Sequence, residues 1–297
     1  MKKRKKRTLS TVILILVFLV GLSLLLYPTV SDYWNSLHQS RAIASYAEQV
    51  AALDNETYER LWEEARAYNE KLPGKADRFR MSEEELAEYE QLLSVSGSNV
   101  IGYIEIEKID CYLPIYHGTS ESVLQVGVGH LEGSSLPTGG AGTHCVVSGH
   151  RGLPSAKLFT DLDKMEEGDT FRLYVLDETM TYEVDQILVV EPSEVDALAI
   201  ADGEDYCTLV TCTPYGINTH RLLVRGHRVE NEAEAPAVRV TADAARIEPA
   251  AMAPAAAAPL LLVLLAGALL LLTGRRKQSR KGDDKENQEG GIQDEDT

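Results

Sequence analysis

Two long apolar runs stand near the ends of the 297-residue chain and bracket a mixed segment between them. The first covers residues 8–27, the second covers residues 251–273, and neither contains a charged side chain. A helix of about 20 apolar residues is long enough to cross the hydrocarbon layer of a membrane. The pattern therefore predicts two transmembrane helices, the second carrying Pro254 and Pro259 in its first half.

Basic residues flank both runs on the side facing the chain ends. Residues 1–7 are basic after the initial methionine, and 274–297 begin with an arginine-rich cluster before an acidic stretch. Positive clusters stay on the cytoplasmic side of a membrane, so both termini are predicted inside and residues 28–250 outside. A cleaved signal peptide is the alternative for the first run, although no small-x-small cleavage site follows before Asp32. A wall-sorting signal is the alternative for the second, although no LPxTG-like motif precedes it.

The segment that follows the first run, residues 28–74, reads as an extracellular helical arm. Residues 31–53 have a helical pattern, and Asp54 or Asn55 is placed to cap a second helix. Pro73 and Gly74 end that second helix, and the arm acts as a spacer or packs on the domain that follows. The apolar positions of the second helix recur at helical spacing: Tyr58, Leu61, Trp62, Ala65 and Tyr68.

Residues 75–97 are more polar than their neighbours. Ser82 and the three glutamates after it form a capping-box pattern, which predicts a short acidic helix through Leu93. Ahead of this helix, Phe79 is an isolated aromatic residue close to Asp77. By itself this segment reads as a solvated loop and a short helix.

From residue 98 to 230 the texture changes to short runs rich in β-branched and aromatic residues, with Gly, Pro and Asp between them. Only one or two helical stretches intervene, near residues 155–165. The pattern predicts a mainly-β domain, either a barrel or a sandwich. Residues 231–250 are rich in Ala, Glu and Pro and read as a linker to the second apolar run.

Charge and cysteine placement exclude several functions. The two predicted cytoplasmic ends hold 12 of the 29 basic and 7 of the 46 acidic residues, which leaves a net charge of −22 on the segment between them. Such an acidic surface argues against nucleic acid or anionic lipid as a partner.

Cys207 and Cys212 lie five residues apart on one predicted strand. The distance between them is about 16 Å, which is too long for a disulfide. The scattered Cys and His residues predict no metal site and no cofactor.

Cys212 is a candidate nucleophile because it ends an apolar strand just before Pro214, where a thiol is partly exposed. Attack on an amide by a thiol also needs a proton donor for the leaving amine and a group that stabilises the oxyanion. His150, at the end of another apolar run, is a candidate proton donor. Arg221 and Arg225 are both candidate cations, and spacing does not choose between them.

Several long strings in this domain resemble class C, pilin-polymerising sortases. They occur in the family's order over residues 98–230: GYIEIEKID, LPIYHGTSE, GVGHLEGSSLPTGG, HCVVSGHRGLPSAKLFTDLD and TLVTCTPYGINTHRLLVRG. The resemblance implies a closed eight-stranded β-barrel with N-terminal helices. It implies catalysis by Cys212, His150 and Arg221, which selects Arg221 over Arg225.

The resemblance also gives residues 75–97 a role as a lid over the active site. Class C sortases carry an Asp-Pro-aromatic motif in the lid, and here Asp77, Arg78 and Phe79 stand in that place. The resemblance predicts that Asp77 pairs with Arg221 and that the Phe79 ring covers the Cys212 sulfur. Arg78 in place of the proline leaves the loop less restricted before it folds.

The reaction implied is transpeptidation. Cys212 would cleave an LPxTG-like sorting signal of a pilin precursor between Thr and Gly, and a pilin lysine would release the thioester. Thr211 is a further candidate for support of the oxyanion or substrate. The alternatives are a housekeeping sortase that anchors proteins to peptidoglycan, a cysteine hydrolase, and a non-catalytic wall-associated scaffold with an inert Cys212.

Overall fold

The computed structural model describes residues 2–75, 77–231 and 267. These residues belong to two separate units, one that includes residues 2–25 and 267 and another that covers residues 26–231. Helix α1 (Lys2–Ala51) begins in the first unit and ends in the second as one unbroken helix that contains Pro28. The predicted helix over residues 31–53 is thus the second part of α1 and not a separate element.

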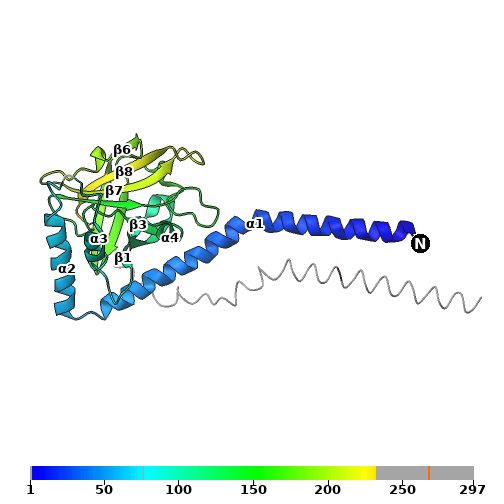
Figure 1. The fold of residues 1–297 in the computed structure, drawn as a ribbon, viewed down its shortest axis with the longest axis horizontal. Helices are drawn as coiled ribbons and strands as arrows, with labels where there is room; N and C mark the ends of the chain where they lie inside the picture. The colour runs from blue at the N-terminus through cyan, green and yellow to red at the C-terminus, as the bar shows by residue number, and fades with distance from the viewer. Residues whose placement is uncertain (1, 76, 232–266, 268–297) are drawn as a thin grey trace, which may run out of the picture. The chain divides into compact units, whose positions relative to one another are not determined.

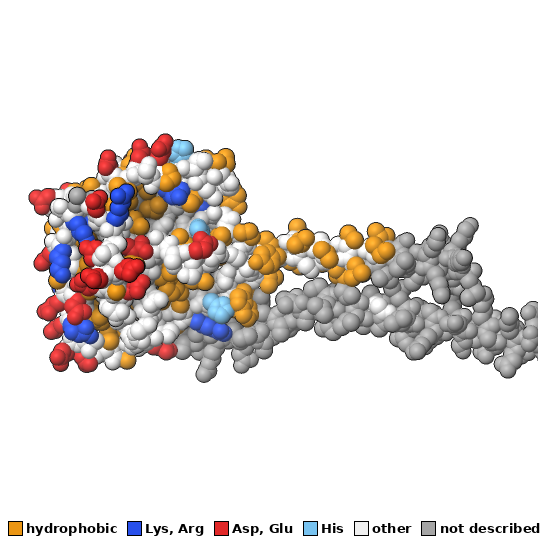
Figure 2. Space-filling view, viewed as in Figure 1, with side chains coloured by type: hydrophobic (Ala, Val, Ile, Leu, Met, Phe, Trp, Pro, Cys, Tyr) orange, Lys and Arg blue, Asp and Glu red, His pale blue; other side chains and the backbone are white. Residues whose placement is uncertain are grey.

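The apolar run near the N-terminus is helical, and most of its side chains over residues 13–27 are exposed. In the described part of the chain, α1 alone is long and apolar enough to cross a membrane, with a mean hydropathy of 2.6 over its most apolar window. Side chains such as Leu14, Phe18 and Leu25 are exposed, and Figure 2 shows apolar groups along this stretch. A membrane anchor and a signal sequence share these features. The second predicted span, the linker beyond residue 231 and the tail lie outside the described residues, apart from Gly267.

Residues 100–229 form the closed barrel that the β texture and the resemblance predicted (Figure 1). Neighbouring strands around the barrel follow the order β1, β2, β3, β4, β7, β8, β6, β5. The pairs β2–β3 and β4–β7 are parallel and the others are antiparallel. The strands are β1 (Val100–Ile106), β2 (Cys111–His117), β3 (Val128–His130), β4 (Thr143–Ser148), β5 (Thr170–Val175), β6 (Glu178–Val190), β7 (Asp205–Thr213) and β8 (His220–Val229).

The barrel interior is filled by alternate side chains of these strands. Buried and partly exposed side chains alternate along β5, because successive side chains of a strand point to opposite faces. Ile, Leu and Val side chains with no exposed surface fill the inward positions of the barrel. A few short helices join the strands. They are α4 (Glu121–Leu124), η1 (Glu107–Ile109), η2 (Leu162–Lys164) and η3 (Asp196–Leu198).

The helix predicted near residues 155–165 is reduced to the single turn η2. Its backbone donors are used elsewhere, because Lys157 N–H donates to the Asp32 carboxylate and Phe159 N–H donates to the His150 carbonyl. The predicted acidic helix forms as α3 (Glu83–Tyr89) with the expected capping box at Ser82. It ends before Leu93, which adopts a positive φ of 54°.

The helical arm packs on the barrel. Helix α2 (Asn55–Glu70) begins after Asp54, whose carboxylate accepts a hydrogen bond from Thr57 N–H at 2.7 Å. Its buried face includes Leu61, Trp62 and Ala65, which belong to the same core cluster as the barrel interior. The arm is therefore a packing element and not only a spacer.

Tyr46 of α1 ties the arm to two strands, which gives a test of this packing. Its buried hydroxyl donates to the Ile101 carbonyl and accepts from Leu176 N–H at 2.7 Å. Tyr46→Phe leaves that N–H buried without an acceptor, so the free energy of unfolding should fall by about 1–3 kcal/mol. Urea unfolding of the full chain in detergent measures this change. Tyr116→Phe is the control, because the Tyr116 hydroxyl makes no hydrogen bond with the described residues, and equal stability of both variants would contradict the prediction.

Candidate active site

Cys212 lies near the end of β7, one residue before that strand ends at Thr213. It is the only one of the four cysteines that is not buried, and all four are free thiols. Burial raises the pKa of the Cys111 thiol to about 12 and raises the pKa of Cys207 well above its ordinary value. Cys212 is therefore the one thiol of the four that is partly accessible to solvent. Cys207 sits on the same strand, as predicted, and forms no disulfide with it.

Arg221 is brought to Cys212 by strand pairing. In the antiparallel ladder of β7 and β8, Cys212 lies directly opposite Arg221, and directly opposite residues place their side chains on one face. Arg225 pairs instead with Thr208, and both of its side-chain nitrogens bind the Asp185 carboxylate at 2.9 and 3.0 Å. The two arginines that spacing left open thus have different surroundings.

His150 follows the end of β4, the parallel neighbour of β7. Beyond the last paired residues, Gly149 N–H donates to the Val210 carbonyl at 3.0 Å, and the Thr211 hydroxyl donates to the Gly149 carbonyl at 2.7 Å. A Cβ on Gly149 would lie 2.7 Å from the ring of Phe159, so only glycine fits there. These contacts fix the residue before His150 against the residue before Cys212.

Thr211, the third candidate from sequence, is 1% exposed. Its one hydroxyl proton is engaged by the Gly149 carbonyl. In this geometry Thr211 links two strands, and a role in supporting the oxyanion stays a prediction.

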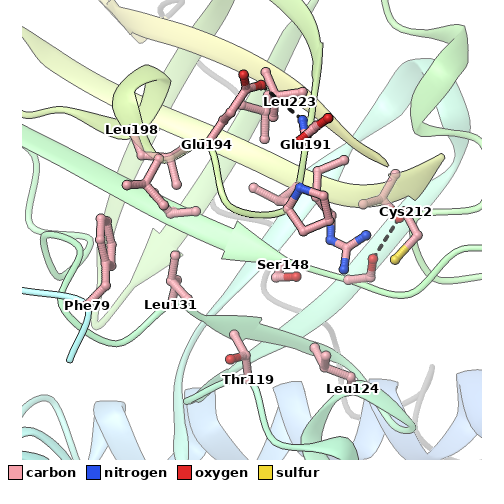
Figure 3. A pocket seen from close by; sticks show the side chains of 18 of the residues that line it. Phe79, Thr119, Leu124, Leu131, Ser148, Glu191, Glu194, Leu198, Cys212 and Leu223 are labelled. Atoms are coloured by element: carbon pink, nitrogen blue, oxygen red, sulfur yellow. Dashed lines mark hydrogen bonds between the residues drawn. The ribbon is translucent and has the colours of Figure 1, made fainter. Parts of the chain in front are cut away.

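Cys212, His150 and Arg221 line one pocket with a volume of about 360 Å³. Its walls also include Leu131, Val146, Leu198 and Leu223 from the barrel and its loops. In Figure 3 the Cys212 sulfur lies at one end of the pocket, and Phe79 with Leu131 lies at the other. The pocket thus has a thiol at one end and apolar side chains at the opposite end.

His117 and His144, which do not line this pocket, are buried and make structural contacts. His144 contacts the Ala199 carbonyl and the Thr208 hydroxyl, and His117 contacts the Leu92 carbonyl. Loss of hydration on burial lowers the pKa of each of these imidazoles to about 4. At neutral pH they are uncharged and cannot serve as proton donors in the form of imidazolium.

The predicted lid segment lies at the apolar end of the pocket. Phe79 lines the pocket, whereas Asp77 is exposed and forms no ion pair with a described residue. Two details of the expectation are therefore not seen: no Asp77–Arg221 pair forms, and the Phe79 ring does not cover the sulfur. The resemblance predicted that the Asp77 carboxylate would make the ionic contact of this segment, but it is the neighbouring Arg78 that makes buried contacts.

Arg78 is 8% exposed and anchors this segment. Its guanidinium donates to the Leu198 carbonyl at 2.5 Å and lies 4.5 Å from the centre of the Phe79 ring. Loss of hydration lowers the pKa of Arg78 from its ordinary value. A Cβ on Gly133 would lie 1.9 Å from the Arg78 carbonyl oxygen. The backbone of Arg78 therefore packs against a position where a side chain would clash with it.

Two residues that the sequence analysis did not single out contact the site. The Glu121 carboxylate of α4 lies 3.6 Å from His150 Nε2. The Arg151 guanidinium binds Asp163 and lies 3.4 Å from the Thr213 hydroxyl, beside the Cys212 strand end. Arg151 adjoins His150 in sequence and could have been noticed, whereas nothing in the local pattern marks Glu121.

Comparisons with known proteins identify the family of this domain. The sortase domain model matches residues 104–229. The crystal structure of sortase C1 from Streptococcus agalactiae is 51% identical and covers 65% of this chain and 100% of that chain, with a TM-score of 0.63. The chain belongs to the sortase family. Sortases are cysteine transpeptidases.

Two further sortases are similar to this chain. Sortase C from Streptococcus pneumoniae is 48% identical over 65% of this chain and 99% of that chain, with a TM-score of 0.59. Sortase D from Bacillus subtilis is 31% identical over 131 residues, which cover 43% of this chain and 63% of that protein. The match to this curated relative thus spans less than two thirds of its length.

The hydrogen bond from the Thr211 hydroxyl to the Gly149 carbonyl gives a test of the site's geometry. Thr211→Val removes the donor from the Gly149 carbonyl, which should lower the free energy of unfolding by about 1–3 kcal/mol. Because His150 is the next residue, alkylation of Cys212 should also slow by about tenfold. Urea unfolding and mass spectrometry of the alkylated full chain measure both effects. Thr211→Ser keeps the hydroxyl and should restore both, and an unchanged alkylation rate in Thr211→Val would contradict the prediction.

Proposed function

We propose that this sortase polymerises pilins through Cys212, His150 and Arg221. The observation that carries the proposal is that these three side chains, from three adjacent strand ends of the barrel, line one pocket. The substrate class draws support from the similarity to sortase C of Streptococcus pneumoniae, whose structure addresses pilin substrate specificity. The substrate is a pilin precursor with an LPxTG-like sorting signal.

In the first half-reaction, the Cys212 thiolate attacks the carbonyl carbon of threonine in the signal. The negative charge that develops on the carbonyl oxygen is stabilised by the Arg221 guanidinium. The Thr–Gly bond breaks, and the glycine nitrogen takes a proton from the His150 imidazolium. The product is a thioester between Cys212 and threonine.

In the second half-reaction, the amine of a pilin lysine attacks the thioester carbonyl. The carbon–sulfur bond breaks, the new amide bond forms, and the proton lost by the amine returns to His150. Thiolate and imidazolium are thereby regenerated, and the bond energy held in the thioester makes ATP unnecessary. No metal or other cofactor takes part in either step.

The catalytic domain is proposed to work outside the cell, with both termini in the cytoplasm. Residues 8–27 and 251–273 are the proposed spans, and the basic clusters at both ends set this orientation. The acidic external segment agrees with a protein partner and not with nucleic acid.

The two ends of the pocket match the threonine and the leucine of the sorting signal. Leucine of an LPxTG-like signal lies three residues before threonine, about 10 Å away in an extended chain. With threonine at Cys212, that leucine is directed toward the apolar end, where Phe79 and Leu131 lie. The Phe79 ring then occupies the place of that leucine until the substrate displaces it. Residues 77–79 thus act as a lid that covers the leucine-binding end of the pocket and not the Cys212 sulfur.

The transpeptidation is tested with the full chain in detergent, a purified pilin precursor and mass spectrometry for a Thr–Lys isopeptide. Cys212→Ala should give no isopeptide. Cys207→Ala, which changes a buried thiol on the same strand, should keep the activity. Isopeptide formation by Cys212→Ala, or transfer only to peptidoglycan-like amines by the unchanged chain, would refute the proposal.

The lid gives a separate prediction. Arg78→Ala removes the hydrogen bond to the Leu198 carbonyl and should raise kcat/KM for a sorting-signal peptide by about tenfold, because a hydrogen bond from a charged group is lost. The alkylation rate of Cys212 with a small reagent should not change, since the ring lies far from the sulfur. The exposed Arg80→Ala, just outside the lid, serves as a control with unchanged kcat/KM. A faster alkylation with no gain in kcat/KM would show that the ring covers Cys212 instead.

A further inference from the structure

The imidazole of His150 has one ring nitrogen whose surroundings are unusual. Nε2 is buried and makes no hydrogen bond with the described residues. A buried polar atom of this kind calls for a charge or partner nearby. The nearest opposite charge is the Glu121 carboxylate, at 3.6 Å from Nε2.

Glu121 is held in this position by its own helix. It is the first residue of α4, and its Oε1 accepts a hydrogen bond of 2.6 Å from the Gln125 side-chain amide. The other oxygen, Oε2, is the one that faces His150. The Gln125 amide, and after it the charge of His150, holds the pKa of the Glu121 carboxyl below its ordinary value. The carboxylate is therefore charged at neutral pH and oriented by its neighbour.

Other charged groups face the same pocket but not at the same distance from His150. Cys212 and Arg221 line it from β7 and β8, and Glu191 and Glu194 line it from the loop after β6. Arg151, next to His150 in its own loop, is paired with Asp163. Among the residues that the structure describes, Glu121 is the one carboxylate within ion-pair distance of the His150 ring.

We propose that Glu121 is a positioning residue that stabilises the protonated form of His150 and fixes which ring nitrogen exchanges protons. This inference rests on the proposed role of His150 as proton donor. A carboxylate within about 4 Å favours imidazolium over imidazole. Because Glu121 faces Nε2, the other nitrogen, Nδ1, is left to give its proton to the leaving glycine amine and to take one from the lysine.

Glu121 acts through His150 and does not touch the bond that breaks. Its side chain is 73% exposed and lies outside the pocket lining, so it neither binds the sorting signal nor supplies a proton itself. Loss of its charge should therefore change the pH dependence of turnover and leave KM for the signal unchanged. A purely structural contribution would instead lower activity equally at every pH.

The test is the pH profile of kcat/KM for a sorting-signal peptide with a lysine amine, measured on the full chain and on Glu121→Gln. Glutamine keeps the size and the acceptor for Gln125 but removes the charge. One limb of the profile should move to lower pH by about half a unit, as expected for loss of a nearby exposed charge. Activity at the optimum should fall about threefold to tenfold, which is less than the loss of roughly 100-fold or more expected when a general acid or base itself is removed.

Glu121→Asp retains the charge and should restore much of the wild-type profile. Glu59→Gln is the matched control, because Glu59 is an exposed carboxylate on α2, outside the pocket lining, and should leave the profile unchanged. A Glu121→Gln profile that superimposes on the wild type, or one lowered uniformly without a shift, would overturn this inference. Absence of transpeptidation by the unchanged chain would instead overturn the proposed function.

Discussion

The active site of this sortase depends on how two parallel strands, β4 and β7, pair at the point where both end. The hydrogen bond from the Thr211 hydroxyl to the Gly149 carbonyl joins the residue before Cys212 to the residue before His150. Among the described residues, neither the Cys212 thiol nor the His150 imidazole makes a side-chain hydrogen bond that would set the spacing between the two groups. A slip of one residue in the pairing would turn Cys212 to the opposite face of the sheet. The closed barrel prevents such a slip, because β7 is also registered against β8.

The segment at residues 77–79, the proposed lid, is anchored by arginine where the resemblance led us to expect proline. Proline would restrict the backbone before folding, whereas Arg78 holds it afterwards through a buried hydrogen bond and contact with the Phe79 ring. Removal of a guanidinium from water is costly unless its donors are satisfied, and Arg78 has no carboxylate partner among the described residues. The anchored state is therefore held by few interactions, as the proposed displacement by substrate requires.

Much of the fold followed from local patterns, because strands and caps are encoded by nearby residues. Pro214 ends β7 as its chemistry requires, and Ser82 caps α3. The choice between Arg221 and Arg225 did not follow, since residues four apart on a strand share a face. Only the register with β7 separates them, and register is a property of two strands. Glu121 was missed for a related reason, since it lies far from His150 in sequence and meets it only when β3 and β4 pair.

The ion pairs of the arginines around the pocket are consistent with the role proposed for Arg221. Arg225 is bound on two nitrogens by Asp185, and Arg151 is bound by Asp163. Arg221 contacts only the backbone carbonyls of Asn218 and His220 among the described residues. Carbonyl oxygens hold a guanidinium in place without neutralising it, so its positive charge stays directed at the pocket. Among the described residues Arg221 forms no ion pair with a carboxylate, and an unneutralised guanidinium is what the proposed stabilisation of the oxyanion requires.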